Sequence, residues 1–234
     1  QQEGEKYHYR TVLTNVLGMC LQAVTGVPLP ALLEQQLWSK LGPEQDACIV
    51  VDRTGFPYVG AGMNACARDL ARFGQLIVQQ GRFGDEQIVS QAWIDDIRYA
   101  DAHAKQIFAA SEYGEMLPGG HYRNKFWVSD AEGGVVLALG IHGQTIHMNM
   151  STGTVIVKFS SQPESVDLEL FTDAFAAMDA IGQSRYLPAF VYIKGQADKI
   201  GYFANKMEIH EHKAAPFWVP EFRPGFWGSV DSMT

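Results

Sequence analysis

A tyrosine just ahead of a helical segment is the first residue in this chain whose type and position could carry proton chemistry. Tyr9 stands in the tripeptide Tyr9-Arg10-Thr11, directly before a run with helical periodicity. Side chains in such a short connection can converge on a cleft. The ordinary pKa of a tyrosine hydroxyl is about 10, so Tyr9 can act as a general base only where a cation stabilises its phenolate. The alternative is a tyrosine that packs half-buried beneath the helix.

A second candidate site is the run Gly140-Ile141-His142-Gly143-Gln144-Thr145, at the start of a predicted strand. Glycine on both sides of a polar pair indicates a backbone that another group approaches closely. A backbone N–H beside such a glycine can form half of an oxyanion hole, and His142 can add a polar or cationic group there. The alternative is a hairpin turn with a solvated histidine.

Other histidines allow two further interpretations. Glu208, His210 and His212 alternate along the chain, so on a strand they would share one face and could hold a metal ion. A solvated strand face explains that pattern equally well, and we predict no metal and no organic cofactor. His103 and His121 stand in a segment without clear periodicity, from which they could reach a cleft.

Helices are predicted in the first part of the chain. Apolar residues at three- and four-residue steps indicate a helix over 13–24 with one buried face, which ends at Gly26. A second amphipathic segment over 32–41 is expected to form a helical hairpin with it. Asn64 is a good N-cap for a third helix, and a fourth is expected over 91–100.

An antiparallel sheet is predicted next, after a long surface loop over 101–124. Four short segments rich in β-formers are separated by spacings that permit only hairpins, which indicates a meander. These segments are 126–128, 135–139, 144–150 and 154–159. A closing helix, with Leu168, Phe171, Phe175 and Met178 on its inner face, completes a predicted α+β fold.

Composition separates a domain over 1–183 from a tail over 184–234 that is rich in aromatic residues and proline. The formal net charge of −8 argues against a polyanion-binding surface, so nucleic acid is not an expected partner. No apolar run reaches the roughly 18 residues of a membrane helix. The cysteines, which are predicted to be small core residues, are Cys20, Cys48 and Cys66.

Three segments, in this order, resemble motifs of one enzyme superfamily. Tyr9-Arg10-Thr11-Val12-Leu13-Thr14-Asn15-Val16-Leu17-Gly18 resembles the Tyr-x-Ser/Asn motif and following helix of the class C β-lactamase-like serine hydrolases. These include penicillin-recognising enzymes, family VIII esterases and 6-aminohexanoate-dimer hydrolases. The run Gly60-Ala61-Gly62-Met63-Asn64-Ala65-Cys66-Ala67-Arg68-Asp69-Leu70-Ala71-Arg72-Phe73-Gly74 resembles their glycine loop and next helix, and His142-Gly143-Gln144 takes the place of their third motif.

The resemblance implies a β-lactamase/transpeptidase-like fold that is incomplete at the N-terminus, and it assigns roles to individual residues. In that superfamily the serine of a Ser-x-x-Lys helix attacks an acyl carbonyl. Tyr9 would then be the general acid and base, and His142 and Gly143 would flank the substrate. The backbone N–H near Gln144 or Thr145 would be half of the oxyanion hole.

The chain departs from this pattern at the nucleophile. No serine has a lysine three residues later, so we expect Ser-x-x-Lys on a segment upstream of Gln1. Asn15 stands where dimer-hydrolase relatives often have Asp, which leaves open a role in holding a substrate amine.

The expected function is therefore that of the C-terminal part of a serine hydrolase, acting on a small ester or amide through an acyl-enzyme. The alternative is a non-catalytic ligand-binding or sensor protein on a penicillin-recognising scaffold. If the chain folds alone, either a homodimer or the tail over 184–234 is expected to fill the gap, because loss of upstream strands would leave an exposed sheet edge.

Overall fold

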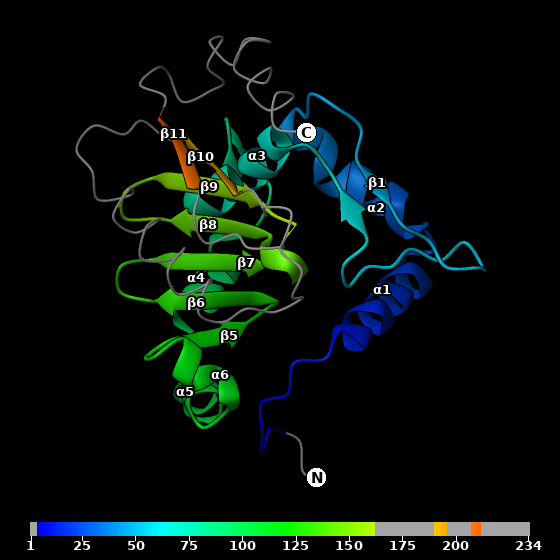
Figure 1. Ribbon diagram of the computed structural model, residues 1–234. Coiled ribbons are helices and arrows are strands. Elements are labelled where there is room, and N and C mark those ends of the chain that lie inside the picture. Colours follow the sequence, from blue (N-terminus) through cyan, green and yellow to red (C-terminus); the bar gives the residue numbers. More distant parts are fainter. Residues whose placement is uncertain (1–3, 162–189, 196–206, 212–234) are drawn as a thin grey trace.

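Seven strands form one sheet in the order β11-β10-β9-β8-β7-β6-β5 (Figure 1). The structure, a computed structural model, describes residues 4–161, 190–195 and 207–211. The strands are β5 His121–Arg123, β6 Phe126–Asp130, β7 Val135–Leu139, β8 Thr145–Asn149, β9 Thr154–Phe159, β10 Phe190–Gly195 and β11 Met207–Glu211.

Strands β5 to β9 are the predicted antiparallel meander, and this prediction is confirmed. Each strand pairs with the next along the chain, so that Leu137 on β7 lies opposite Trp127 on β6 and His147 on β8. Short turns permit only this arrangement. Strand β10 then pairs parallel to β9, and β11 pairs antiparallel to β10.

Side chains on both faces of the sheet are buried. Because side chains alternate along a strand, Val136, Met148 and Val155 share one face, which packs against α3 (Ala67–Val78) and α4 (Gln91–Tyr99). The opposite face carries a second core cluster with Phe108 of α5 (Ala102–Ala109). The predicted α+β fold is confirmed.

Most of the other described elements precede β5 in the chain. The N-terminal helices α1 and α2 lie to one side of the sheet (Figure 1), and η1 packs against α3. The bounds are α1 Thr11–Thr25, α2 Leu29–Gln36, η1 Trp38–Leu41, α6 Glu112–Met116, β1 Cys48–Ile49, β2 Met63–Asn64, β3 Arg82–Phe83 and β4 Glu86–Gln87.

Helix α1 ends where the sequence predicts but does not bury the face that was expected to be buried. Gly26 has the left-handed conformation (φ 68°) and donates from its backbone N–H to the carbonyl of Gln22. Gly18 is the one buried residue of α1, whereas Leu17 is 52% exposed. The described part of the chain packs no element over that apolar face, so its predicted burial is wrong for this structure.

The two N-terminal helices meet at a corner. Their axes turn by 80° between α1 and the segment from α2 to η1, so the predicted hairpin is more open than an antiparallel pair. Among the described helices, none is by itself long and apolar enough to cross a membrane; only this bent pair reaches that length and composition, and only jointly.

Two predicted local features are wrong. Helix α3 begins at Ala67 after Cys66, and Asn64 lies instead in β2, where its side-chain amide donates to the carbonyl of Gly62. Residues 101–124 are not a loop but contain α5, α6 and β5. Helices of eight and five residues contain too few turns to show a period, although Asp101 and Ser111 cap them through their side chains.

The predicted core position of the cysteines is also wrong. Cys20 and Cys48 are exposed, and Cys66 is half-buried. The apolar neighbours of Cys20 lie on the exposed helix α1, and Cys48 lies in a two-residue strand. Apolar neighbours in the sequence therefore did not predict whether these cysteines are buried.

The predicted closing helix over 168–178 lies outside the described residues, and so does most of the tail over 184–234. Strands β10 and β11 are the described parts of that tail, and both belong to the central sheet. The division of the chain at residue 183 stays a prediction.

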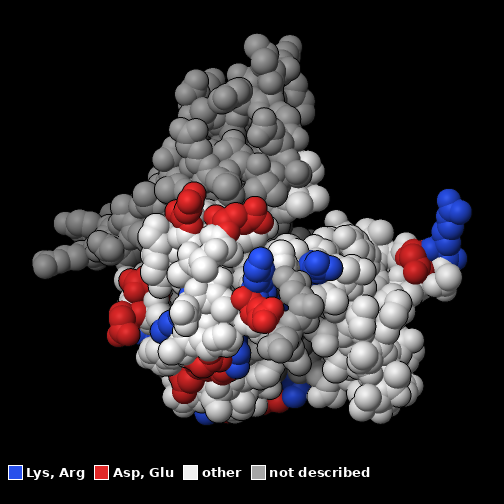
Figure 2. Space-filling view, turned by 90° about the horizontal axis from the view of Figure 1, so that it is seen from below, with Lys and Arg blue, Asp and Glu red and all other residues white. Residues whose placement is uncertain are grey.

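Charged side chains of both signs share the surface. On the face shown in Figure 2, Lys and Arg side chains lie close to Asp and Glu side chains over the described part of the molecule. The ion pairs include Arg123 with Asp96 and Arg72 with Glu44. The formal net charge of the chain is −8, and the absence of a nucleic-acid partner stays a prediction.

Candidate active site

Tyr9 lies at the edge of an aromatic cluster, in extended chain just before α1. Its ring stacks on Trp127 of β6 with centroids 5.6 Å apart and meets Tyr122 of β5 edge-on at 5.8 Å. Stacked and edge-on pairs of this kind stabilise aromatic contacts beyond simple burial. Tyr9 is nevertheless 41% exposed, so solvent or a ligand can reach it while its ring is held.

The neighbouring tyrosines have a different environment. Burial raises the pKa of Tyr7 and the pKa of Tyr122 well above the ordinary value, and nearby tyrosines add to both effects. The phenolate form of both residues is therefore even rarer at neutral pH than that of an ordinary tyrosine. The Tyr7 hydroxyl also has no hydrogen-bond partner among the described residues. Of these three tyrosines, Tyr9 is the one that is accessible for proton transfer.

The second candidate site is a single turn of 3₁₀ helix, η2 (Ile141–Gly143), between β7 and β8. Two successive residues in it have left-handed backbone, His142 with φ 60° and Gly143 with φ 82°. This conformation is unusual for histidine and ordinary for glycine. The turn is closed by a bond from the Gly140 N–H to the Gln144 carbonyl, with N and O 2.9 Å apart.

Side chains tie this turn to β9. The amide of Gln144 donates to the Ser160 carbonyl and accepts from the Ser160 N–H at 3.1 Å. The Thr145 hydroxyl donates to the carbonyl of Gly143 at 3.3 Å. Thr145 itself lies inside β8, opposite Leu139 on β7 and Lys158 on β9. The side chains of Gln144 and Thr145 thus shape the turn.

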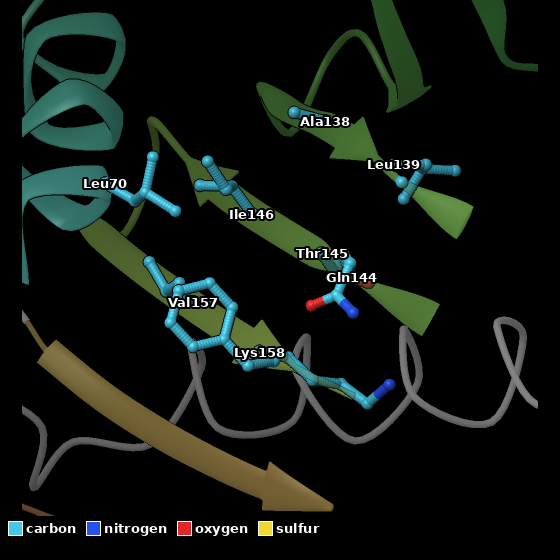
Figure 3. A pocket seen from close by; sticks show the side chains of 10 residues that line it. Leu70, Ala138, Leu139, Gln144, Thr145, Ile146, Val157 and Lys158 are labelled. Atoms are coloured by element: carbon cyan, nitrogen blue, oxygen red, sulfur yellow. The ribbon is translucent and has the colours of Figure 1, made fainter. Parts of the chain in front are cut away.

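A buried lysine completes these contacts. Lys158 is only 1% exposed, and its Nζ donates to the Gly143 carbonyl at 2.7 Å. Burial lowers the pKa of Lys158 to about 8. In Figure 3 its side chain extends away from Leu70 and Val157.

A mainly apolar pocket adjoins the turn on the α3 side (Figure 3). Leu70 of α3 and Ile146 of β8 contribute to its wall, and Gly140 and Gln144 belong to both the pocket and the turn. Thr145 and Lys158 also line this pocket, so the pocket and the turn share most of their polar residues.

The strand register places the two candidate sites at one end of the sheet. Trp127, on which Tyr9 stacks, pairs with Leu137, three residues before Gly140. The β5–β6 turn at Asn124 and Lys125 therefore lies at the same sheet end as η2. The structure brings Tyr9 and the turn to this end of the sheet.

Asn15 contacts the glycine loop. Its side-chain oxygen accepts from the Gly60 N–H at 3.0 Å. A Cβ at Gly60 would stand 2.3 Å from the Thr11 methyl carbon, so glycine is required where the loop meets α1. The structure thus gives Asn15 a role in joining helix and loop, and its role toward a substrate amine stays a prediction.

The other histidines of the sequence analysis have structural contacts. His121 is fully buried, and its Nε2 lies 3.0 Å from the Ile97 carbonyl; His103 makes a similar contact with Gly4. Searched over the described residues, the structure holds no group of His, Cys, Asp and Glu suited to a metal ion. Glu208 and His210 belong to β11, whose side chains are not described, and His212 lies outside the described residues.

Comparison with known proteins agrees with the motifs and the fold. A family model described as "Beta-lactamase" matches residues 1–177. The chain belongs to the β-lactamase family. This confirms the superfamily expected from Tyr9, the glycine loop and the His142-Gly143-Gln144 segment.

Two known proteins are similar to more than half of the chain. The 6-aminohexanoate-dimer hydrolase of Paenarthrobacter ureafaciens is 31% identical over an alignment of 183 residues, and the match covers 75% of this chain and 46% of that protein. A solved structure from Bacillus anthracis that carries the name of a putative 6-aminohexanoate-dimer hydrolase has a TM-score of 0.65 and 29% identity. It covers 77% of this chain and 45% of its own, so the chain spans less than half the length of either relative.

Sequence reasoning missed two residues of the site. The sequence indicates only a strand at Trp127, because a tryptophan in a β-rich run is ordinary. Lys158 carried a usable signal: in the apolar strand Thr154–Phe159 it occupies an inward position together with Thr154 and Ile156. A lysine at such a position needs a specific partner.

Proposed function

We propose that this chain supplies the acid–base tyrosine and the oxyanion turn of a serine hydrolase that acts on a small ester or amide. Membership of the β-lactamase family supports this proposal. The observation that carries it is the position of Tyr9: its ring is stacked on Trp127 and its surface is exposed, whereas burial raises the pKa of the neighbouring Tyr7 and Tyr122.

Tyr9 is proposed to move one proton in each half of the reaction. Its phenolate takes the proton of the attacking serine hydroxyl while the serine oxygen bonds to the acyl carbon. Tyr9 then gives that proton to the leaving oxygen or nitrogen as the bond to the acyl carbon breaks. Water, deprotonated by Tyr9, cleaves the acyl-enzyme, and the serine recovers its proton from Tyr9.

The turn between β7 and β8 is proposed to hold the oxyanion. A backbone N–H aimed at the developing charge typically contributes about 10²- to 10³-fold to such a reaction. Of the two residues named for this role, Gln144 fits better, because its N–H makes only a long 3.5 Å bond to the Ile141 carbonyl. Thr145 lies between two paired strands. His142 and Gly143 would flank the substrate.

The nucleophile is proposed to come from a part of the hydrolase that this chain does not contain. None of its serines is followed by lysine at the third position, and the relatives are more than twice as long as the part they share with it. The cation of Ser-x-x-Lys would also stabilise the Tyr9 phenolate. The rival function is a binding or sensor protein that lacks this nucleophile.

The substrate is proposed to be a linear amide or ester. The relative from Paenarthrobacter ureafaciens is named for hydrolysis of the 6-aminohexanoate dimer, so that compound is the first to test. The third motif here is His-Gly-Gln in place of Lys-Thr-Gly, which favours esters and linear amides over β-lactams.

The test is a hydrolysis assay with the complete product of the gene that encodes this chain. We expect release of 6-aminohexanoate from the dimer or of p-nitrophenol from p-nitrophenyl acetate, with a burst equal to one product per enzyme. Such a burst reports an acyl-enzyme. Saturable binding of these compounds without any turnover would favour the sensor protein instead.

A further inference from the structure

The contacts of helix α1 with the glycine loop around Gly60 lie on one face of the helix. Thr11, Asn15 and Gly18 share this face, at steps of four and three residues. Gly18 lies so close to the loop that an added Cβ would stand 2.7 Å from a methyl carbon of Val59. The exposed apolar residues of α1, such as Leu17, lie on the other faces of the helix. The narrow face therefore sets where α1 stands.

A hydrogen bond between Asn15 and Gly60 holds this face in place. The side-chain oxygen of Asn15 accepts from the Gly60 N–H, with O and N 3.0 Å apart. Gly60 also lies against the first residue of α1, since a Cβ on Gly60 would stand 2.3 Å from the Thr11 methyl carbon. Because the bond is directional and glycine has no side chain to push the helix away, the start of α1 is held close to the loop.

The glycine loop is itself tied to the core of the molecule. The Gly62 N–H donates to the Tyr58 carbonyl at 2.7 Å, and the Gly62 carbonyl accepts from the Val50 N–H at 2.9 Å. The loop then leads through β2 into α3, which packs on β8 and β9 of the sheet. The bond between Asn15 and Gly60 thus connects α1 to a part of the chain that is fixed relative to the sheet.

Tyr9 depends on this connection because it stands just before α1. Its main chain leads directly into the first turn of α1, while its ring is stacked on Trp127 of β6. The ring is 41% exposed, so stacking alone leaves it room to slide along the indole. A tyrosine that transfers protons needs its hydroxyl at a fixed place, because a misplacement of about 1 Å can lower the rate about 10²-fold.

We propose that Asn15 is a positioning residue that fixes Tyr9 for proton transfer by holding the start of α1 against Gly60. This inference rests on the proposed hydrolase function. Asn15 acts through the helix and not on the reacting atoms, since its side-chain oxygen is bonded to the loop. This role differs from the contact with a substrate amine, which its place in the sequence left open.

The test compares Asn15→Leu with Asn15→Asp in the complete gene product. Leucine has nearly the shape of asparagine without an acceptor, whereas aspartate keeps an oxygen to which the Gly60 N–H can donate. We expect kcat to fall about 10-fold for Asn15→Leu with KM nearly unchanged, because a displaced acid–base group acts mainly in the transition state. Asn15→Asp should stay within about 2-fold of wild type. The control Gln35→Leu, at an exposed glutamine of α2, should keep the wild-type values.

A double-mutant cycle with Tyr9→Phe separates positioning of Tyr9 from a general loss of structure. If Asn15 acts through the Tyr9 hydroxyl, Asn15→Leu should change kcat by less than about 2-fold in the Tyr9→Phe background. A loss of about 10-fold in both backgrounds would overturn the proposal, because Asn15 would then act independently of Tyr9.

Hydrogen exchange gives a readout that does not depend on activity. In mass spectrometry, the peptides over 7–13 and 58–62 should exchange about 10-fold faster in Asn15→Leu than in wild type, Asn15→Asp or Gln35→Leu. Unchanged exchange in these peptides would overturn the proposal. If wild type has no hydrolase activity but the exchange changes as expected, the proposed function fails and the hold of Asn15 on the segment of Tyr9 stands.

A second variant covers failure of Asn15→Leu to fold, which a thermal melt would reveal. Asn15→Ala also removes the acceptor, and alanine suits a helix better than any other residue. The expected results are the same: a lower kcat, loss of that effect in the Tyr9→Phe background, and faster exchange over 58–62. Wild-type exchange in Asn15→Ala would show that the loop does not need the bond and would overturn the proposal.

Discussion

Trp127, Tyr113 and Tyr122 surround the ring of Tyr9 and leave part of it exposed. The sequence indicated that Tyr9 could transfer protons, but it did not indicate which side chains surround it. The tripeptide Tyr9-Arg10-Thr11 indicated a candidate base, but the stacking partner comes from a strand more than a hundred residues later in the chain. Long-range contacts of this kind leave no local pattern in the sequence.

Removing the hydroxyl of Tyr9 is predicted to abolish most catalysis and leave the fold intact. Tyr9→Phe keeps the ring that stacks on Trp127 and removes the proton carrier. In the complete gene product kcat should fall by about 10²- to 10⁴-fold. Steady-state hydrolysis with circular dichroism as the folding check measures this.

Tyr7→Phe is the matched control for that experiment. It removes a hydroxyl that is buried and has no partner among the described residues, so activity should be retained and stability unchanged or slightly higher. Equal activity of Tyr9→Phe and Tyr7→Phe would show that Tyr9 carries no proton.

Periodicity predicted the longer elements well and the shorter ones poorly. The strands of the meander and helix α4 were predictable because alternation and helical spacing extend over enough residues. Helices α5 and α6 were missed because each has few turns. The start of α3 was misplaced because Asn64 pairs in a strand, whereas the contact that fixes this helix comes from Asp69.

Asp69 is predicted to hold the start of α3 to the loop before β1. It is 1% exposed and accepts from the backbone N–H groups of Glu44 and Gln45 at 2.9 and 3.1 Å. Asp69→Asn leaves one of these donors without its acceptor, so the free energy of unfolding should fall by about 2 kcal/mol. Urea denaturation measures this, with the exposed Asp85→Asn as control.

The effect of Asp69→Asn is also predicted to depend on pH. Burial would raise the pKa of Asp69, but hydrogen bonds from Cys66, Glu44 and Gln45 outweigh it and lower the pKa. A lowered pKa stabilises the fold above the unfolded value of about 3.9, and that contribution is lost as pH falls through the folded pKa. The difference in the free energy of unfolding between wild type and Asp69→Asn should therefore narrow below about pH 4. A difference that stays constant with pH would show that Asp69 does not act as a carboxylate.

The contact between α1 and the glycine loop gives a second prediction for an element. Gly60→Ala places a Cβ 2.3 Å from the Thr11 methyl carbon and should destabilise the protein by about 1–3 kcal/mol. Thr11→Ser removes that methyl, so the double variant should recover part of the loss in a thermal melt. No recovery would show that the clash lies elsewhere.

The whole molecule leaves one apolar surface uncovered in the described structure. Leu13, Leu17, Leu21 and Val24 of α1 are half or more exposed, with Val24 at 86%. Contiguous exposed apolar residues indicate a contact surface. Helical spacing predicted this helix because it is a local signal in the sequence. The partner of its apolar face is a long-range contact, which helical spacing does not show.

The 234-residue chain alone is predicted to associate through this face of α1. Leu17→Lys with Val24→Lys should shift its sedimentation toward monomer and reduce binding of an apolar dye, because the charges disrupt the apolar surface. Gln36→Lys on α2 adds a charge at an exposed polar position and should leave association unchanged. A wild-type chain that is monomeric and binds no dye would contradict this prediction and the expected homodimer.

The central claim, that this chain is part of a serine hydrolase whose nucleophile lies outside it, is tested most directly by intact-mass analysis with a fluorophosphonate probe. The protein isolated from its own source and the 234-residue chain alone are treated side by side. We predict that the isolated protein is heavier than the 25.9 kDa of this chain and gains one probe mass, while the chain alone gains none. An adduct on the chain alone, or an isolated protein of 25.9 kDa that gains no adduct, would contradict the account.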